Sequence, residues 1–231
     1  MGKNSKIAWC DHTFNPWIGC QRVSAGCDNC YAKSWNERYK RCVWGKSRVR
    51  TSEANWKQPL KWAKESNGAK VFCASLSDWL DNKVPVSWRD DLATLILKTP
   101  ELTWLLLTKR IENYERLKPW KECPKNVWLG VTAENQEMYD KRWPILSKID
   151  ATVRFISYEP AIGYIEIKNR PFPDWVIMGG ESGAKARNMP ESWCRLMRDN
   201  CTVLDIPFFM KQMTGRKEPP KELFIREFPN D

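Results

Sequence analysis

The sequence predicts an α/β fold, in the form of a closed or partial (β/α) TIM-like barrel with about six to seven strands. Short apolar segments rich in branched and aromatic residues alternate with longer amphipathic segments along most of the chain. The apolar segments are nearly continuous, as in parallel strands covered on both faces. Polar residues follow them directly, where a barrel gathers its loops around one mouth. A doubly wound open sheet has the same order of elements and is the alternative.

The predicted strands are the short apolar segments of this pattern. The first lies within residues 6–15, and the others have the ranges 70–75, 102–108, 127–132, 152–157, 174–180 and 206–211. We expect right-handed crossovers between consecutive parallel strands, and each crossover needs a long connection, usually a helix.

Helical patterns lie between these strands, at residues 85–98, 111–118, 135–149 and 189–204. Ser87 is the expected N-cap of the first helix, and Leu196 is expected to face the core from the last. Pro144 should kink or divide the third helix. Pro190 suits the first turn of the fourth.

Length and composition favour one domain over residues 1–231, with a basic insertion at about 38–69. The formal net charge of +10 favours anionic partners, above all nucleic acid. No apolar run approaches the roughly 18 to 20 residues that span a bilayer. The N-terminal residues lack the apolar region of a secretory signal, so we expect a cytoplasmic protein without membrane contact.

Three cysteines, Cys20, Cys27 and Cys30, lie within eleven residues of a polar loop. Nine cysteines in a reducing compartment argue against a disulfide framework and for metal ligation by the close ones. Three thiolates can hold three irons of a [4Fe-4S] cluster and leave the fourth iron open to a small molecule. Structural zinc with Cys10 or His12 as a fourth ligand is the alternative.

Six motifs carry a resemblance that runs nearly end to end: "FNPWIGCQRVSAGCDNCYA", "WLLLTKR", "WLGVTAEN", "RFISYEPAIG", "DWVIMGGESGAKAR" and "PFFMKQ". The chain resembles a largely uncharacterised protein family of phages, prophages and bacteria, which is similar in fold to radical S-adenosylmethionine enzymes. Tyr31, directly after Cys30, fits the resemblance. The superfamily's usual cysteine spacing is Cys-x3-Cys-x2-Cys, whereas this chain has six residues in the first gap. Its Gly-Gly-Glu motif follows the second strand, whereas here it follows a later one, at 179–181.

The resemblance implies a [4Fe-4S] cluster on Cys20, Cys27 and Cys30, with S-adenosylmethionine as the second cofactor. It implies an enzyme that generates a 5′-deoxyadenosyl radical, with an electron donor such as flavodoxin or ferredoxin. The candidate cofactor-binding residues follow the predicted strands: Ser75, Ser77, Asp78, Lys109, Thr132, Glu134, Glu159, Gly179, Gly180 and Glu181. No catalytic residue is assigned. Asn135 is an alternative helix cap, and Lys109 and Arg110 are alternatively the solvated start of a helix.

The expected substrate of such an enzyme is a nucleic acid or a nucleotide, because the chain is strongly basic. An alternative function is nucleic-acid binding or repair without radical chemistry, with an iron-sulfur or zinc site that orders the binding surface. A metal-dependent hydrolase using Glu159 and Glu181 is disfavoured, since the chain has one histidine and few clustered acids.

Overall fold

The computed structural model describes residues 2–168 and 170–229. The chain divides into two compact units. The first unit takes the chain up to Arg22 together with Ala32–Leu129 and Asp150–Thr152. The second takes Val23–Tyr31, Gly130–Ile149 and the chain from Val153 onward. The cysteine-rich loop is therefore divided, with Cys20 in the first unit and the other two thiols of the trio in the second.

Seven strands follow one another in sheet order β1-β4-β5-β6-β7-β8-β9, which is also their order in the chain. The strands are parallel, and β1 and β9 are the two edges of the sheet. This arrangement confirms the predicted α/β fold in its partial-barrel form. The strands are β1 (His12–Phe14), β4 (Lys70–Cys73), β5 (Thr103–Thr108), β6 (Val127–Thr132), β7 (Val153–Tyr158), β8 (Trp175–Gly179) and β9 (Phe208–Gln212). Each lies within about two residues of its predicted range.

In the first unit, parallel pairing aligns the carboxyl ends of β1, β4 and β5. Phe14 lies opposite Cys73, and Cys73 lies opposite Leu106. The polar residues that follow these strands therefore leave the sheet at one edge. A separate antiparallel pair joins β2 (Trp17–Ile18) to β3 (Val49–Arg50).

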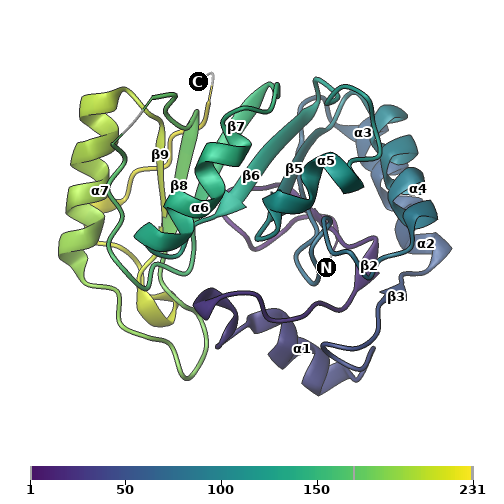
Figure 1. Ribbon diagram of the computed structural model, residues 1–231, viewed down its shortest axis with the longest axis horizontal. Helices are drawn as coiled ribbons and strands as arrows, with labels where there is room; N and C mark the ends of the chain where they lie inside the picture. Colours follow the sequence, from purple (N-terminus) through teal and green to yellow (C-terminus); the bar gives the residue numbers. More distant parts are fainter. Residues whose placement is uncertain (1, 169, 230–231) are drawn as a thin grey trace. The chain divides into compact units, whose positions relative to one another are not determined.

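Aromatic side chains form much of the first unit's core. The rings of Trp9 and Phe72 lie 4.5 Å apart, and Phe14 meets Trp104 edge to face at 5.7 Å. The helices of this part are α1 (Tyr31–Tyr39), α2 (Glu53–Trp56), α3 (Gln58–Glu65), α4 (Val86–Leu97) and α5 (Tyr114–Leu117), with the 3-10 turn η2 (Ile111–Asn113). In Figure 1, α1 lies in the lower part of the view, apart from β5 of the same unit.

In the second unit, β7 pairs with β8 and β8 with β9, all in parallel. The helix α7 (Glu191–Leu204) runs alongside β8 and β9 (Figure 1). The helix α6 (Gln136–Leu146) begins where Asn135 accepts a hydrogen bond from the Met138 amide at 3.0 Å, so the alternative of Asn135 as a cap is confirmed. Short 3-10 turns complete the unit: η1 (Ala25–Cys27), η3 (Thr214–Arg216) and η4 (Lys221–Leu223).

Several helix predictions need correction. Pro85, with φ −55° and ψ 140°, occupies the N-cap of α4, so Ser87 lies within the helix and does not cap it. Leu196 is 49% exposed on α7, because the buried side of that helix is formed by Cys194, Met197 and Cys201. Pro144 lies inside α6 without dividing it.

The predicted insertion at 38–69 is largely ordered, since it contains β3, α2 and α3. Its helix α3 carries the chain from β3 towards β4, so part of the segment belongs to the strand–helix–strand order of the fold. Among the described residues, no helix is both long enough and apolar enough to cross a membrane.

Candidate functional site

A buried carboxylate, Asp78, organises the first unit beyond the end of β4. Thr108 donates to Asp78 Oδ1 at 2.7 Å, and the Lys109 amide donates to Oδ2 at 3.1 Å. Arg110 Nη1 donates to Oδ2 at 2.8 Å, and the Leu80 amide donates to Oδ1 at 3.0 Å. Four donors thus occupy the acceptor positions of this carboxylate, and its role in the structure is to hold the polar end of β5.

The same Arg110 side chain reaches the first cysteine of the trio. Its Nη1 donates to Cys20 Sγ at 3.4 Å, and its Nη2 donates to the Gln21 carbonyl at 2.8 Å. Burial raises the pKa of the Cys20 thiol to about 11, although the Arg110 charge acts in the opposite direction. Burial by itself would lower the pKa of Arg110, but the Asp78 carboxylate together with Cys20 and Asp81 outweighs it and raises that pKa. Arg110 is therefore a fixed positive charge beside Cys20.

Ser75 and Ser77, also predicted as cofactor contacts, follow β4 directly. Asn15, at the end of β1, donates from Nδ2 to Ser75 Oγ at 2.9 Å and accepts from the Leu76 amide at 2.7 Å. The Ser77 hydroxyl is buried and has no hydrogen-bond partner among the described residues. A buried hydroxyl without a partner indicates a position where a water or ligand is accommodated.

In the second unit, Glu134 fastens the cysteine loop to the end of β6. Its Oε1 accepts from the Gly26 amide at 3.2 Å, and its Oε2 accepts from Arg142 Nη1 at 2.7 Å. Arg142 also donates to the Thr132 carbonyl at 2.8 Å, which places this predicted residue in the same network. A Cβ on Gly26 would lie 2.9 Å from Glu134 Oε1, so glycine permits the close approach.

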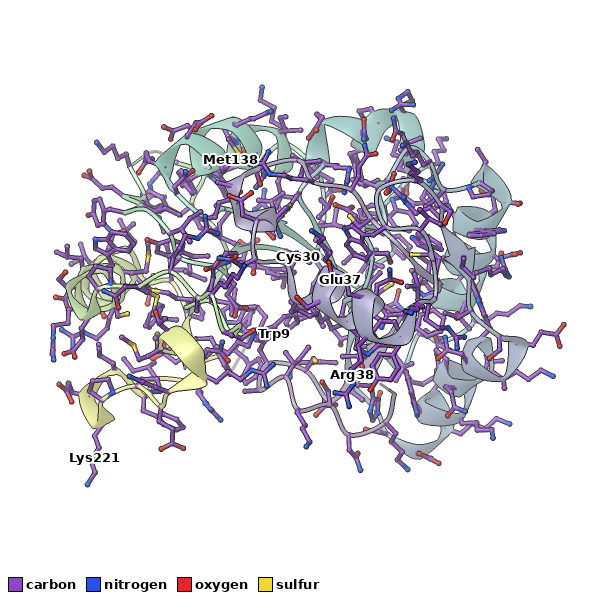
Figure 2. The ribbon with its side chains drawn as sticks, turned by 90° about the horizontal axis from the view of Figure 1, so that it is seen from below. Trp9, Cys30, Glu37, Arg38, Met138 and Lys221 are labelled. Atoms are coloured by element: carbon purple, nitrogen blue, oxygen red, sulfur yellow. The ribbon has the colours of Figure 1, made fainter. Side chains whose placement is uncertain are left out.

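Glu181, after β8, fastens the same loop at a second point. Its Oε2 accepts from Asn29 Nδ2 at 3.0 Å and from the Arg187 amide at 2.7 Å. The Arg187 guanidinium also pairs with Glu181 and donates to the Ala25 carbonyl at 2.9 Å. Burial would raise the pKa of Glu181, but the hydrogen bonds from Arg187 and Asn29 outweigh it and lower that pKa. The loop residues next to Cys27 and Cys30 are thus held by two acids at strand ends; Cys30 directly precedes α1 (Figure 2).

Glu159, after β7, forms an ion pair with Lys211 of β9 at 2.7 Å, and the pair is partly buried. Two glycines at the end of β8, Gly179 and Gly180, allow neighbouring parts of the chain to approach closely. A Cβ on Gly179 would lie 2.7 Å from Glu159 Oε1, and a Cβ on Gly180 would lie 2.6 Å from the Thr214 amide nitrogen. In this structure, the glycines admit protein atoms at the end of the sheet.

Two further hydroxyls in this unit, those of Ser24 and Ser157, are buried without a hydrogen-bond partner among the described residues. Ser24 lies in the cysteine loop, immediately before η1, and Ser157 lies near the end of β7. Like Ser77 in the first unit, they mark polar positions that the folded chain leaves unsatisfied.

The predicted cluster ligands Cys20, Cys27 and Cys30 are partly accessible thiols, and none of them is in a disulfide. Among the described residues, no three His, Cys, Asp or Glu side chains are gathered closely enough to hold a metal ion. Cys20 belongs to the first unit, and Cys27 and Cys30 belong to the second. The donor set of three partly accessible thiols in a polar loop fits an iron-sulfur cluster by its chemistry. Of the other cysteines, Cys73, Cys194 and Cys201 are fully buried in the core.

The sequence profile of one protein family matches residues 4–222 of this chain. The family is described as proteins of unknown function, DUF5131. The chain belongs to this family. The match confirms the predicted membership of an uncharacterised family. No curated protein matches the chain.

Solved structures of spore photoproduct lyase are similar to this chain. A mutant of that enzyme with dinucleoside spore photoproduct is 11% identical, with a TM-score of 0.60, over 93% of this chain and 79% of the lyase. A second mutant, with bound AdoMet and dinucleoside spore photoproduct, is 10% identical, with a TM-score of 0.59, over the same shares of 93% and 79%. At this identity, the likeness shows a shared fold.

Four residues of these networks escaped prediction, namely Asn15, Asn29, Arg142 and Arg187. Arg142 lies within a predicted helix, where its charge suggests a solvated face, yet it is almost fully buried. Asn29 and Arg187 lie in loops whose sequence carries no periodic pattern. A signal was available for Arg187 in the motif "GGESGAKAR", where it lies six residues after Glu181.

Proposed function

We propose that this chain is a radical S-adenosylmethionine-type enzyme with a [4Fe-4S] cluster on Cys20, Cys27 and Cys30. One observation carries the proposal: three partly accessible thiols lie in a polar loop of a chain whose fold is shared with a lyase that binds AdoMet. Such a cluster, held by these three thiolates, would supply the electron that reductively cleaves bound S-adenosylmethionine to methionine and a 5′-deoxyadenosyl radical.

The chain's own residues support this assignment by the way they hold the thiols. The Asp78–Arg110 pair presents a fixed hydrogen-bond donor to Cys20 Sγ. The Arg110 charge acts towards the thiolate form, which is the form that ligates iron, although burial outweighs it and leaves the pKa of Cys20 raised. Glu134 and Glu181 restrain the loop segment that carries Cys27 and Cys30. Ligands held in this way lose less conformational entropy when they bind a cluster.

We propose that S-adenosylmethionine is bound by polar groups that follow the strands. The buried hydroxyls of Ser77 and Ser157 are candidates, because they have no hydrogen-bond partner among the described residues. The ammonium of Lys109 and the Glu159–Lys211 pair are candidates for the carboxylate and amino group of the methionine moiety. The carboxylates of Asp78, Glu134 and Glu181 accept hydrogen bonds from other protein groups. Their proposed role is therefore to position neighbouring groups.

A nucleic acid or nucleotide is the proposed substrate class. The chain's net charge of +10 supports it, as does the dinucleoside lesion bound by the structurally similar lyase. The electron must come from a low-potential donor, and a flavodoxin or ferredoxin is the class we propose.

The experiment is anaerobic reconstitution with iron and sulfide, followed by reduction in the presence of S-adenosylmethionine and detection of 5′-deoxyadenosine. We expect the wild-type protein to carry close to four irons and to form the product. Replacing any of Cys20, Cys27 or Cys30 by Ala should abolish both iron retention and product. Cys42→Ala and Cys10→Ala are matched controls that should retain both.

Loss of iron in Cys10→Ala would contradict the three-ligand site and favour four protein thiolates. A full cluster that yields no 5′-deoxyadenosine, with or without added nucleic acid, would contradict radical chemistry. That result would favour the alternative of an iron-sulfur protein that binds or repairs nucleic acid without it. Tight zinc without iron would contradict the cluster itself.

A further inference from the structure

Residues 32–50 concentrate positive charge in the first unit. The stretch contains seven basic residues and one acidic residue, a net charge of +6 out of +10 for the whole chain. Two of its arginines are engaged by acids: Arg48 forms a buried pair with Asp81, and Arg50 pairs with Asp91 at 2.8 Å. The remaining basic residues are exposed.

Four of these exposed side chains have no acidic partner within 4.0 Å among the described residues: Arg38, Lys40, Arg41 and Lys46. They lie on the last turn of α1 and on the loop that follows it. Figure 2 labels Arg38 and Glu37 on α1, and Glu37 is the single acid of the stretch. Unpaired, exposed cations crowded into so short a segment repel one another and favour binding of a polyanion.

Aromatic rings are interleaved with these charges. The rings of Trp35 and Tyr39 lie 4.7 Å apart on consecutive turns of α1, and Tyr39 is 50% exposed. The Arg38 guanidinium lies 5.5 Å from the Tyr39 ring centroid. Rings beside cations can stack on the unpaired bases of a single strand. The bases of a duplex are already stacked on one another and are not available to these rings.

Hydrogen bonds hold the loop in a defined shape. Asn36 accepts from the Cys42 amide at 3.0 Å and donates to the Cys42 carbonyl at 2.9 Å. The Ser47 hydroxyl accepts from the Val43 amide at 3.0 Å. The Gly45 amide donates to the Cys20 carbonyl at 2.9 Å, so the loop is joined directly to the first cysteine of the trio. A preformed surface loses less entropy on binding.

We propose that this surface, formed by Trp35, Arg38, Tyr39, Lys40, Arg41 and Lys46, docks single-stranded nucleic acid. The cations track the phosphates, and the Trp35–Tyr39 pair stacks on bases. Because the Gly45 amide is hydrogen-bonded to the Cys20 carbonyl, nucleic acid bound at this surface would lie beside the segment that carries Cys20. The inference extends the proposed function by naming where its polymer docks, but binding at this surface needs neither cluster nor S-adenosylmethionine.

The test is fluorescence anisotropy of the full chain with a labelled single strand of about 15 nucleotides, at salt concentrations from about 50 to 200 mM. Arms with single-stranded DNA, single-stranded RNA and duplex distinguish the polymers. The charge variant combines Arg38→Gln, Lys40→Gln, Arg41→Gln and Lys46→Gln. The matched control removes four exposed lysines elsewhere in the same unit: Lys61→Gln, Lys64→Gln, Lys98→Gln and Lys121→Gln.

We expect wild type and control to bind a single strand more tightly than a duplex. The charge variant should bind at least roughly tenfold more weakly, and its slope of log K against log salt should fall by about 3. Tyr39→Ala should weaken binding roughly 5- to 100-fold with the salt slope unchanged, and Tyr39→Phe should restore it. Circular dichroism checks folding, and the tyrosine pair still decides the matter if the charge variant does not fold.

Equal weakening by control and charge variants would overturn the inference, because net charge alone would then explain binding. Duplex or anionic lipid vesicles bound more tightly than the single strand would also overturn it. A protein that forms 5′-deoxyadenosine but does not bind the strand contradicts only the docking surface. A protein that binds the strand through these residues but forms no 5′-deoxyadenosine contradicts only the proposed chemistry.

Discussion

Arg110 shows how one side chain can join a strand end to a candidate ligand. It is almost fully buried, pairs with Asp78 at 2.8 Å and contacts Cys20 Sγ at 3.4 Å. A buried ion pair is about as stabilising as apolar residues of the same size would be. Removal of one partner, however, leaves the other charge buried without a partner, which is strongly destabilising.

Arg110→Gln should therefore lower the free energy of unfolding by about 3 kcal/mol. Urea denaturation of the cluster-free protein measures it. The control is Arg198→Gln, because Arg198 pairs with an exposed Asp199 and its loss should cost less than about 1 kcal/mol. A loss under 1 kcal/mol for Arg110→Gln would show that water or a rearranged side chain compensates Asp78.

Glu181 gives a prediction about pH, because hydrogen bonds from Arg187 and Asn29 lower its pKa in the folded protein. A carboxylate with a lowered pKa stabilises the fold above its unfolded value, here 4.5, and loses that effect as pH falls through the folded value. The stability difference between wild type and Glu181→Gln should thus be constant near neutrality and shrink below about pH 4.5. Denaturation midpoints at a series of pH values measure it, and a difference independent of pH would contradict the assignment.

At the scale of elements, packing in the second unit depends on a glycine in β6. A Cβ on Gly130 would lie 2.2 Å from the Phe155 ring of β7, and that ring is fully buried. The ring cannot move outward easily, because it packs against Trp175 at 5.7 Å between centroids. A close-packed core transmits such a clash as strain.

Gly130→Ala should destabilise the protein by about 2 to 3 kcal/mol through overpacking. Phe155→Leu removes ring atoms at the point of contact, so the double variant should be more stable than the sum of the two single losses predicts. Thermal or urea denaturation of the four proteins completes the cycle. Strictly additive losses would show that the two residues do not interact.

Some helices and strands could be predicted from the sequence better than others. Strands such as 127–132 and 153–158 were predictable, since buried parallel strands have nearly continuous apolar sequence. The start of α4 was not, because Ser87 is the residue type that suits an N-cap, whereas the incoming chain places Pro85 at that position. The Asp78–Arg110 pair needed the β4–β5 register, which sequence periodicity does not provide.

For the whole molecule, the order of strands and the class of fold were predictable from the alternation of elements. The division of the cysteine loop between two compact units was not, because it depends on long-range contacts of residues 23–31 through Glu134 and Glu181.

The central claim is that three protein thiolates hold a [4Fe-4S] cluster whose fourth iron is open to S-adenosylmethionine. Electron paramagnetic resonance of the anaerobically reduced protein, before and after S-adenosylmethionine is added, tests it most directly. We predict a cluster signal whose spectrum changes on addition and is identical in Cys10→Ala and wild type. An unchanged spectrum from a fully loaded cluster, or no iron-dependent signal in the reconstituted protein, would contradict the account.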